Sequence, residues 1–317
     1  MATLPVIDFG PFLLPQSSLE DKAAVAAQID RACRESGFFY LRGHGVPQEL
    51  LDGIRNIART FFQTATAEEK QSIALKRSDE GGDNARGYRK VVAEKGSHEA
   101  VDFYRSVVPS TRPYKTGMGP NQWPKSPANF RPVAEAYIDR MQSLGLSVIE
   151  ALALGLGVES QTLLSRVDEA FWSLSVLGYE GRDPQTPAKS GIGEHTDFGI
   201  LTFLLTDQTR NALQVLNKDG QWIYADPGCF LCNIGDMLAE WTRGAYKSTL
   251  HRVVHSSATP RISVPFFFDP NLDAFIEPLL PASGEDDIEY SGIKYRQKFT
   301  ESVEKPLWRE PLVAVES

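Results

Sequence analysis

The feature that most restricts the fold of this chain is a succession of short apolar segments, separated by turn residues, that begins near Phe171. These segments have the length of strands and comprise residues 174–179, 191–198, 201–206, 212–216, 221–224, 229–234, 250–254 and 262–268. Two of them flank residues 217–220, Asn-Lys-Asp-Gly, which contain the favoured hairpin dipeptide Asp-Gly. Many short strands with frequent turns predict a jelly roll or a barrel in this half of the chain.

The N-terminal half has helical periodicity instead. Apolar residues between Leu50 and Phe62 recur at the i, i+3, i+4, i+7 spacing of a helix packed on a core. Thr66 and Glu69 have the spacing of a capping box, which predicts the start of another helix. A long helix over residues 133–154 is expected to brace the β core. Further helices are predicted over residues 19–36 and 291–303.

A metal site is suggested by His195-Thr196-Asp197, which occurs inside one of the strand-like segments. A histidine and a carboxylate two positions apart point to the same face of an extended strand, so both can reach one ion. His251, in a later strand-like segment, supplies a third ligand. Two histidines and one carboxylate form the facial triad of non-haem Fe(II) oxygenases, which leaves the opposite coordination positions open.

An anion site is suggested ten residues later by Arg261-Ile262-Ser263. An arginine and a hydroxyl on one face of a strand can hold a carboxylate through charge-assisted hydrogen bonds. The ordered set of His-x-Asp, a distal histidine and Arg-x-Ser is far more specific than an isolated His-x-Asp.

These motifs, with the opening Pro-Val-Ile-Asp-Phe at residues 5–9 and Gly-Phe-Phe-Tyr-Leu-Arg-Gly-His-Gly-Val at 37–46, resemble the isopenicillin N synthase-like family of Fe(II)/2-oxoglutarate-dependent dioxygenases. The resemblance covers nearly the whole chain. It implies a mainly β (α+β) fold, a double-stranded β-helix or jelly roll flanked by N-terminal and C-terminal helices. Residues 1–132 would form the N-terminal region of this fold and residues 133–317 the region that binds Fe(II) and 2-oxoglutarate, packed together as one compact unit.

The same resemblance implies roles for individual residues. 2-Oxoglutarate would chelate the iron held by His195, Asp197 and His251, and its distal carboxylate would meet Arg261 and Ser263. Tyr179 matches a tyrosine of the family that also contacts the co-substrate. Two residues before this tyrosine many relatives have asparagine, whereas this chain has Leu177, which removes one polar contact near the co-substrate.

The expected reaction is oxidation, chiefly hydroxylation, of a small molecule, with release of succinate and CO2 and with O2 as the oxidant. Ascorbate is a candidate reductant. Desaturation, ring closure or demethylation would need only a different pose of the substrate, so the substrate and its pathway stay open. No other catalytic side chain beyond the metal centre is required.

Substrate contacts are harder to place. Tyr104 and Arg105 lie in a predicted strand, residues 101–108, that resembles the wall of the substrate pocket in relatives. Phe198, beside His-x-Asp, and Phe267, in the aromatic run after Arg-x-Ser, are candidates to line the pocket. Alternation along a strand allows only some of these aromatic side chains to face the metal.

Other polar residues have a structural interpretation. His44, in a His-Gly turn, is expected to be structural, and neither His98 nor His255 is expected to bind metal. Residues 78–87 are predicted to form a surface loop. The cationic residues Arg86, Arg89 and Lys90 are interpreted as a solvated face.

Composition limits the partners. The net charge of −8 and the pI near 5.3 argue against nucleic acid and against anionic membranes as partners. No apolar run reaches the length of about 20 residues that spans a bilayer, and we see no secretory signal. The three cysteines, Cys33, Cys229 and Cys232, fit a reducing compartment and are interpreted as thiols of the fold. We therefore expect a cytoplasmic enzyme, a monomer or weak homo-oligomer, that acts on a small molecule.

Three alternatives remain at this point. An oxidase of the isopenicillin N synthase type would keep the fold and the iron but take all electrons from its substrate. A zinc-dependent hydrolase would use the same three ligands and need a general base, for which Glu194 is the nearest candidate. A non-catalytic metal-binding protein would not need the Arg261 and Ser263 positions to be filled.

Overall fold

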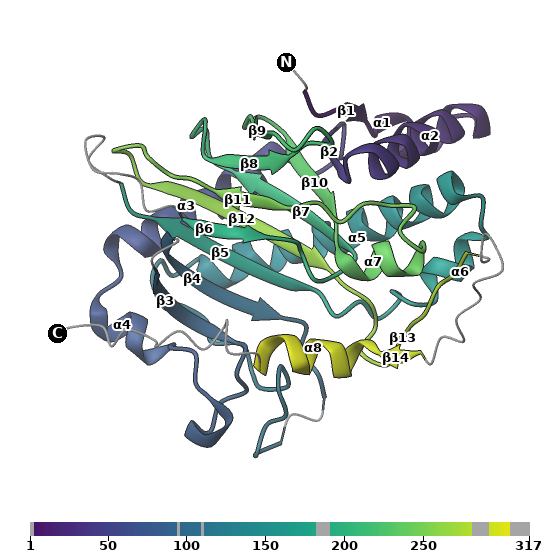
Figure 1. Ribbon diagram of the computed structural model, residues 1–317. Coiled ribbons are helices and arrows are strands. Elements are labelled where there is room, and N and C mark those ends of the chain that lie inside the picture. The colour runs from purple at the N-terminus through teal and green to yellow at the C-terminus, as the bar shows by residue number, and fades with distance from the viewer. Residues whose placement is uncertain (1–2, 94–95, 109–110, 182–190, 281–291, 305–317) are drawn as a thin grey trace.

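Two β-sheets face each other at the centre of the structure, a computed structural model that describes residues 3–93, 96–108, 111–181, 191–280 and 292–304 (Figure 1). The major sheet has eight strands in the order β1-β2-β10-β7-β12-β5-β4-β3, and the minor sheet has four in the order β6-β11-β8-β9. The strands of the major sheet are β1 (Val6–Asp8), β2 (Phe38–Arg42), β3 (Gly87–Ala93), β4 (Gly96–Tyr104), β5 (Ser173–Tyr179), β7 (Leu201–Thr206), β10 (Phe230–Ile234) and β12 (Arg261–Phe268). Those of the minor sheet are β6 (Ile192–His195), β8 (Leu213–Leu216), β9 (Trp222–Ala225) and β11 (His251–Val253).

Helices cover the outer face of the major sheet, where α5 runs behind the strands in Figure 1. The helices are α1 (Gly10–Leu13), α2 (Leu19–Glu35), α3 (Gln48–Thr64), α4 (Ala67–Ser72), α5 (Phe130–Leu156), α6 (Ser160–Leu164), α7 (Asp236–Trp241) and α8 (Tyr295–Glu304), with a 3-10 turn, η1 (Ser78–Glu80), and a small ribbon of β13 (Phe275–Ile276) and β14 (Ile293–Lys294). None of the helices within the described residues is both long and apolar enough to cross a membrane. The predicted jelly-roll core with flanking helices is confirmed.

The side chains of strand β12 point alternately to the two faces of the major sheet, and an apolar core lies on each face. Ile262, Val264, Phe266 and Phe268 belong to the large core between the major sheet and the helices. Arg261, Ser263 and Phe267 alternate with them and therefore point to the opposite face, between the two sheets. The space between the sheets is lined by a smaller core that includes Leu177, Leu204, Leu213, Leu231 and Val253. The predicted functional residues thus lie between the sheets, at the inner face.

Several predicted boundaries were accurate because the local signals are strong. The Thr66 hydroxyl accepts a hydrogen bond from the Glu69 N–H at 3.1 Å and begins α4. The hairpin at Asp-Gly joins β8 to β9, with Leu216 paired to Trp222 and Gly220 at φ +75°. The two buried cysteines, Cys33 and Cys232, are free thiols.

Other predictions were wrong in extent. The strand predicted over residues 191–198 ends at His195, and the strand predicted over residues 101–108 is β4, Gly96–Tyr104. His98 therefore lies within β4. Arg86 is 2% exposed, and the Arg89 side chain is 13% exposed, so the interpretation of these two cations as a solvated face was wrong.

Candidate metal centre and co-substrate site

His195 and His251 face each other as a cross-strand pair. They are register partners in the antiparallel ladder between β6 and β11, and their ring centroids are 4.2 Å apart. Directly opposed residues of two antiparallel strands place their side chains side by side on one face of the sheet. The pairing of these two strands therefore brings together histidines that are 56 positions apart in the sequence.

Asp197 reaches the histidines from a loop and not from the strand, because β6 ends two residues earlier. This loop is held by the start of α7, where the N–H of Asp236 donates to the carbonyl of Asp197 at 2.8 Å. Gly199 is required in the same loop, since a Cβ there would lie 1.5 Å from Oδ1 of Asp269. Strand alternation was the wrong reason for the convergence of His195 and Asp197, although the two side chains do converge.

The three side chains offer ligand atoms that all lie within 4.8 Å of one another. Oδ1 of Asp197 is 3.7 Å from Nε2 of His195 and 3.5 Å from Nε2 of His251. Two ligands at right angles, each about 2.1 Å from one ion, would be about 3 Å apart. A small contraction around a single cation is enough to close this arrangement.

Both imidazoles are oriented for metal binding through Nε2. Nδ1 of His195 is 2.9 Å from the carbonyl oxygen of Gly193, and Nδ1 of His251 is 3.1 Å from that of Thr249. A carbonyl can only accept, so Nδ1 carries the proton and Nε2 presents its lone pair. This second hydrogen bond of each ring is typical of metal-bound histidine.

The charges of the cluster favour a cation. Burial and the neighbouring His251 lower the pKa of His195, so this ring is neutral at physiological pH. Burial alone would raise the pKa of Asp197, but the two histidines and Asn233 outweigh it, and the net shift is downward. Burial acts to lower the pKa of His251, but the Asp197 carboxylate shifts it upward. The cluster therefore places an ionised carboxylate between two imidazoles, an arrangement that favours binding of a cation.

Two residues that the sequence did not single out fix the Asp197 carboxylate. Its Oδ2 accepts hydrogen bonds from Oγ1 of Thr202 at 2.5 Å and from Nδ2 of Asn233 at 2.7 Å. Thr202 and Asn233 are themselves register partners on β7 and β10 of the major sheet. With Oδ2 occupied, Oδ1 is the oxygen that is left for a metal. A polar residue at an inward position of an otherwise apolar strand was the signal that could have revealed each of them.

The predicted anion site forms on the next strands. Arg261 and Tyr179 are register partners on β12 and β5, with the guanidinium 4.8 Å from the tyrosine ring centroid. The Ser263 hydroxyl lies 3.5 Å from the Tyr179 hydroxyl. Leu177 pairs with Ser263 and joins the apolar core between the sheets, so the asparagine of many relatives is replaced by an apolar contact.

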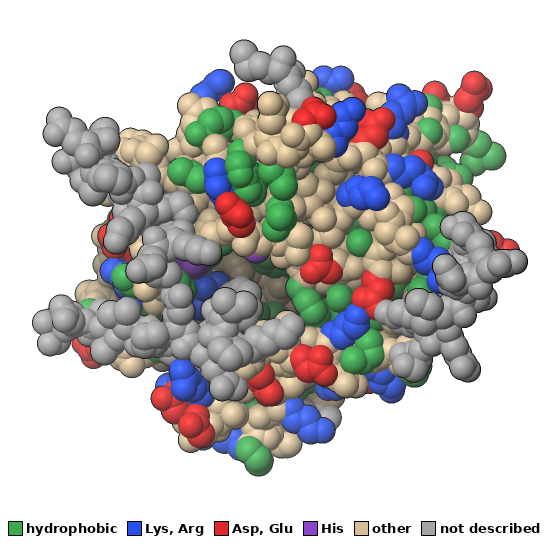
Figure 2. All heavy atoms as spheres, in the orientation of Figure 1, with side chains coloured by type: hydrophobic (Ala, Val, Ile, Leu, Met, Phe, Trp, Pro, Cys, Tyr) green, Lys and Arg blue, Asp and Glu red, His purple; other side chains and the backbone are tan. Residues whose placement is uncertain are grey.

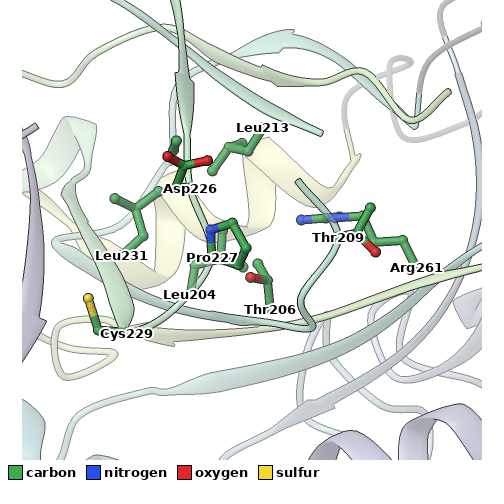
Figure 3. A pocket seen from close by; sticks show the side chains of 10 residues that line it. Leu204, Thr206, Thr209, Leu213, Asp226, Pro227, Cys229, Leu231 and Arg261 are labelled. Atoms are coloured by element: carbon green, nitrogen blue, oxygen red, sulfur yellow. The ribbon is translucent and has the colours of Figure 1, made fainter. Parts of the chain in front are cut away.

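The Arg261 side chain is a buried cation whose guanidinium is only partly hydrogen-bonded within the described residues. The residue is 1% exposed, and within the described part of the chain its Nε and Nη1 have no hydrogen-bond partner. A buried charge without a partner is costly, so this site favours an anion that supplies oxygens to the guanidinium. The carboxylate of a 2-oxo diacid fits this need. Figure 3 shows Arg261 projecting into a small pocket that Thr206, Leu213 and Leu231 also line.

The predicted substrate residues separate into two groups. Phe267 faces the inside, next to Thr202 in the ladder, and Phe198 follows the metal carboxylate, with its ring 5.8 Å from that of Tyr295. Tyr104 is the last residue of β4, and its ring packs against the large core, 5.8 Å from the ring of Phe171. Arg105 lies beyond the end of β4, where its guanidinium is 3.7 Å from Glu169. The roles of these four residues stay predictions.

The other histidines are placed apart from the triad. Nδ1 of His44 accepts a hydrogen bond from the N–H of Val46 at 3.2 Å, and its ring packs on Phe230, which suits a structural role. Nδ1 of His98 lies 2.9 Å from the carbonyl of Gly191. The metal-ligand cluster found among the described residues contains neither of them, nor His255.

Comparison with known proteins gives one consistent family. A family described as "non-haem dioxygenase in morphine synthesis N-terminal" matches residues 4–126, and the "2OG-Fe(II) oxygenase superfamily" matches residues 171–270. Homoarginine-6-hydroxylase 2-ODD-C23 of Glycine max is 38% identical over 298 residues, which cover 88% of each chain. Homoarginine-6-hydroxylase 2-ODD-233 of Oryza sativa subsp. japonica is 37% identical, with 87% of this chain and 88% of the relative covered.

A solved structure agrees with these relatives. The crystal structure of a full-length Neurospora crassa protein in complex with alpha-KG superimposes with a TM-score of 0.84 at 27% identity, and the match covers 95% of each chain. The similarity therefore extends over the helices as well as the two sheets.

Proposed function

The chain belongs to the Fe(II)- and 2-oxoglutarate-dependent dioxygenases, and from this premise we propose that His195, Asp197 and His251 bind the iron. The observation that supports this assignment best is the convergence of their three ligand atoms within 4.8 Å, with both Nδ1 atoms tied to carbonyls. The enzyme is a non-haem dioxygenase that hydroxylates a small molecule. When bound, Fe(II) with 2-oxoglutarate and O2 supplies the oxidation of a substrate C–H bond, coupled to release of succinate and CO2.

We propose that Arg261, Ser263 and Tyr179 bind the distal carboxylate of 2-oxoglutarate. The guanidinium of Arg261 would donate to both carboxylate oxygens, and the two hydroxyls would rotate to donate to the same group. The Nε and Nη1 atoms of Arg261, without a hydrogen-bond partner among the described residues, favour an anion at this position, and the neighbouring Tyr179 favours 2-oxoglutarate as that anion. They equally disfavour the zinc hydrolase, which has no use for a buried anion site at this position.

The protein's own contribution is orientation and exclusion of water. Thr202 and Asn233 hold the carboxylate of Asp197 in one rotamer, and the Nδ1 hydrogen bonds hold the two imidazoles. Apolar side chains of the inner core surround the co-substrate site and keep solvent from the reacting centre. Figure 2 shows a hollow on this face of the molecule, with histidine visible beside it.

We propose that the substrate is an amino acid with a cationic side chain, of the class to which homoarginine belongs. Two relatives that are 37–38% identical over most of both chains are named homoarginine-6-hydroxylases. Such a substrate carries three charged groups, so its binding site needs both cationic and anionic side chains near the metal.

Further properties belong to the same proposal. We propose that the enzyme works in the cytoplasm as a monomer or weak homo-oligomer, with ascorbate as the reductant that keeps iron in the Fe(II) state. Residues 1–132 and 133–317 would act as one compact unit. The buried free thiols Cys33 and Cys232 support a reducing compartment.

The test is an anaerobic titration of the Fe(II)-loaded enzyme with 2-oxoglutarate, followed through the visible charge-transfer absorption of the chelate. We expect the band in the parent and its loss in Asp197→Ala and Arg261→Ala. Asp219→Ala, in the exposed β8–β9 turn, and Arg210→Ala, whose side chain is 73% exposed, are matched controls that should keep it. Bound iron without a band in the parent would overturn the co-substrate assignment.

A further inference from the structure

A buried polar cluster lies on the inner face of the major sheet, to one side of the metal ligands. The Asp102 carboxylate on β4 accepts a hydrogen bond from the Ser175 hydroxyl at 2.5 Å and from Nε of Arg89 at 2.6 Å. Nη1 of Arg89 lies 3.2 Å from Nε2 of His98. We call Arg89, His98, Asp102 and Ser175 the β3–β5 cluster.

The protonation of the β3–β5 cluster follows from its geometry. Burial, with the charge of Arg89, lowers the pKa of His98 to about 3, so this ring is neutral. Its Nδ1 lies 2.9 Å from the carbonyl of Gly191, which can only accept, so Nδ1 carries the proton and Nε2 accepts from Arg89. Asp102 is 5% exposed and carries the opposite charge to Arg89. Within the cluster, the charges of Asp102 and Arg89 offset each other, and Ser175 and His98 are neutral hydrogen-bond partners.

Register places this cluster beside the reaction centre. Phe267 on β12 pairs with Thr202, which holds the metal carboxylate, and on its other side with Ser173 of β5. Ser175, two residues along β5 on the same face, pairs with Asp102 on β4. Adjacent strands are about 4.8 Å apart, so Asp102 lies about 10 Å to the side of β12. A substrate of extended shape can lie over β5 with one end at this cluster and the other at the metal.

The outer face of the same strands serves a different purpose. Val101 and Phe103 alternate with Asp102 and belong to the core under the helices. The charged side chains of the cluster alternate with these core residues and therefore lie on the face of β4 that is turned toward the minor sheet. Replacing a buried ion pair by apolar residues is often neutral or stabilising, so stability alone is a weak reason for this pair.

The arrangement of charge discriminates between ligands. A lone guanidinium that approaches Asp102 meets the positive Arg89 within 2.6 Å of the carboxylate, and a lone carboxylate that approaches Arg89 meets Asp102. A group with an ammonium and a carboxylate on one carbon avoids both repulsions, since each of its charges faces the opposite charge of the pair. The α-amino-acid head is such a group.

We infer that Asp102 and Arg89 bind the α-ammonium and the α-carboxylate of an amino-acid substrate, with Ser175 and His98 as positioning residues. The inference rests on the proposed function and adds the orientation of the substrate. Thr202, which holds the Asp197 carboxylate, is on β7, three strands from β4. The head therefore lies about 14 Å to the side of β7, so the oxidised carbon is far from the α-carbon, toward the end of the side chain.

The test combines protein variants with ligand variants in a thermodynamic cycle. Anaerobic calorimetry on the enzyme loaded with Fe(II) and 2-oxoglutarate would measure the Kd of L-homoarginine and of its analogues that lack the α-ammonium or the α-carboxylate. A charge-assisted hydrogen bond contributes enough for loss of either group to weaken binding to the parent about 10- to 100-fold. In Asp102→Asn, the Kd of the analogue without the α-ammonium should differ from that of L-homoarginine by less than about 3-fold. The variant has already lost the interaction that the ammonium makes in the parent. Arg89→Gln should behave in the same way for the carboxylate.

Controls keep a structural role distinguishable. Lys90→Gln removes a cation next to Arg89 that pairs with Glu180 at the surface, and it should leave every Kd unchanged. Ser175→Ala keeps the charges of Asp102 and Arg89. It should raise the Kd of L-homoarginine and of both analogues by a similar factor, one smaller than the effect of Asp102→Asn on L-homoarginine. If Asp102→Asn does not fold, the cycle of Arg89→Gln with the analogue that lacks the α-carboxylate still decides the question.

Two outcomes would overturn the inference. One is a cycle in which ligand and protein changes are additive, which would mean that the head group and the pair do not touch. The other is a parent that forms the 2-oxoglutarate band but binds L-homoarginine no better than its truncated analogues. In both cases the band shows that the proposed function stands, whereas absence of the band in the parent would mean that the function itself is wrong.

Discussion

The two ends of the inner face are built by different means. The proposed metal and co-substrate end contains two cross-strand pairs, His195 with His251 and Arg261 with Tyr179, so strand pairing sets much of its geometry. The proposed substrate end depends on contacts between side chains, as in Asp102 with Arg89, and on residues beyond strand ends. Strand register can fix the residues for iron and 2-oxoglutarate, which every substrate requires. Side chains that recognise the substrate can differ without a change in the pairing of the strands.

The comparison predicts the largest effect for a metal ligand. His251→Ala removes one of three ligands from a site that has no spare donor among the described residues, so we expect loss of stoichiometric iron and a fall in activity of at least about 10³-fold. Iron content after anaerobic loading and succinate release would be measured together. His44→Ala is the control, because this histidine bonds to the backbone of Val46 and should keep the iron. Full iron binding by His251→Ala would contradict the assignment.

The next effect concerns the buried cation of the co-substrate site. Arg261→Ala should raise the KM for 2-oxoglutarate by more than about 100-fold, and Arg261→Lys by about 10- to 100-fold, because lysine keeps the charge but loses the bidentate fork. Steady-state kinetics in 2-oxoglutarate with a fixed substrate would show the difference. Arg252→Lys is the matched control, since Arg252 stacks 4.1 Å above Trp222 and pairs with Glu194. Equal KM values for Arg261→Lys and the parent would show that the fork is not used.

A smaller effect is expected from the residues that hold the metal carboxylate. Asn233→Leu keeps the volume but frees one side of Oδ2 of Asp197, and the affinity for Fe(II) should fall about 10- to 100-fold. Competition with a chelator would give the affinity. Gln214→Leu removes another buried amide, one that bonds to Arg252, and should cost stability without affecting iron. If both variants bind iron as the parent does, Asn233 only stabilises the fold.

Sequence reasoning succeeded where a property is local or carried by an ordered motif. The strands, the hairpin at Asp219-Gly220 and the cap at Thr66 follow from short-range chemistry, and the three metal-ligand candidates were identified by residue type and order. Asn233 and Thr202 were missed because their role depends on the pairing of β7 with β10, which no local pattern encodes.

The same limit explains the error at the substrate end. A run of cations looks like a solvated surface unless the partners are known, and Asp102, the partner of Arg89, lies 13 positions away on the next strand. Sequence order also predicted that Asp197 converges with the two histidines, but for the wrong reason, since a loop held by α7 takes the place of the continued strand.

The smallest predicted effect is at the junction of the two ends, where Asp269 bonds both to the loop after the metal carboxylate and to the C-terminal helix. Its carboxylate accepts from the N–H of Ile200 at 3.3 Å and from the hydroxyl of Tyr295 at 2.8 Å. Burial raises the pKa of Asp269 to about 7, above its unfolded value near 3.8. The native state therefore binds this proton more tightly, so the contribution to stability is present below pH 4 and is lost as the pH rises from about 4 to about 7.

Asp269→Asn mimics the neutral acid, so it should remove this dependence. In metal-free protein, the free energy of unfolding of the parent should fall relative to that of the variant by about 1–3 kcal/mol between pH 4 and pH 8. Denaturant unfolding at several pH values would give the difference curve, in which other titrating groups cancel. A flat difference would mean that Asp269 is already ionised in the folded protein at low pH. In that case the hydrogen bonds that its carboxylate accepts from Tyr295 and Ile200 outweigh the effect of burial on its pKa, and the stability of this junction does not depend on Asp269 titration.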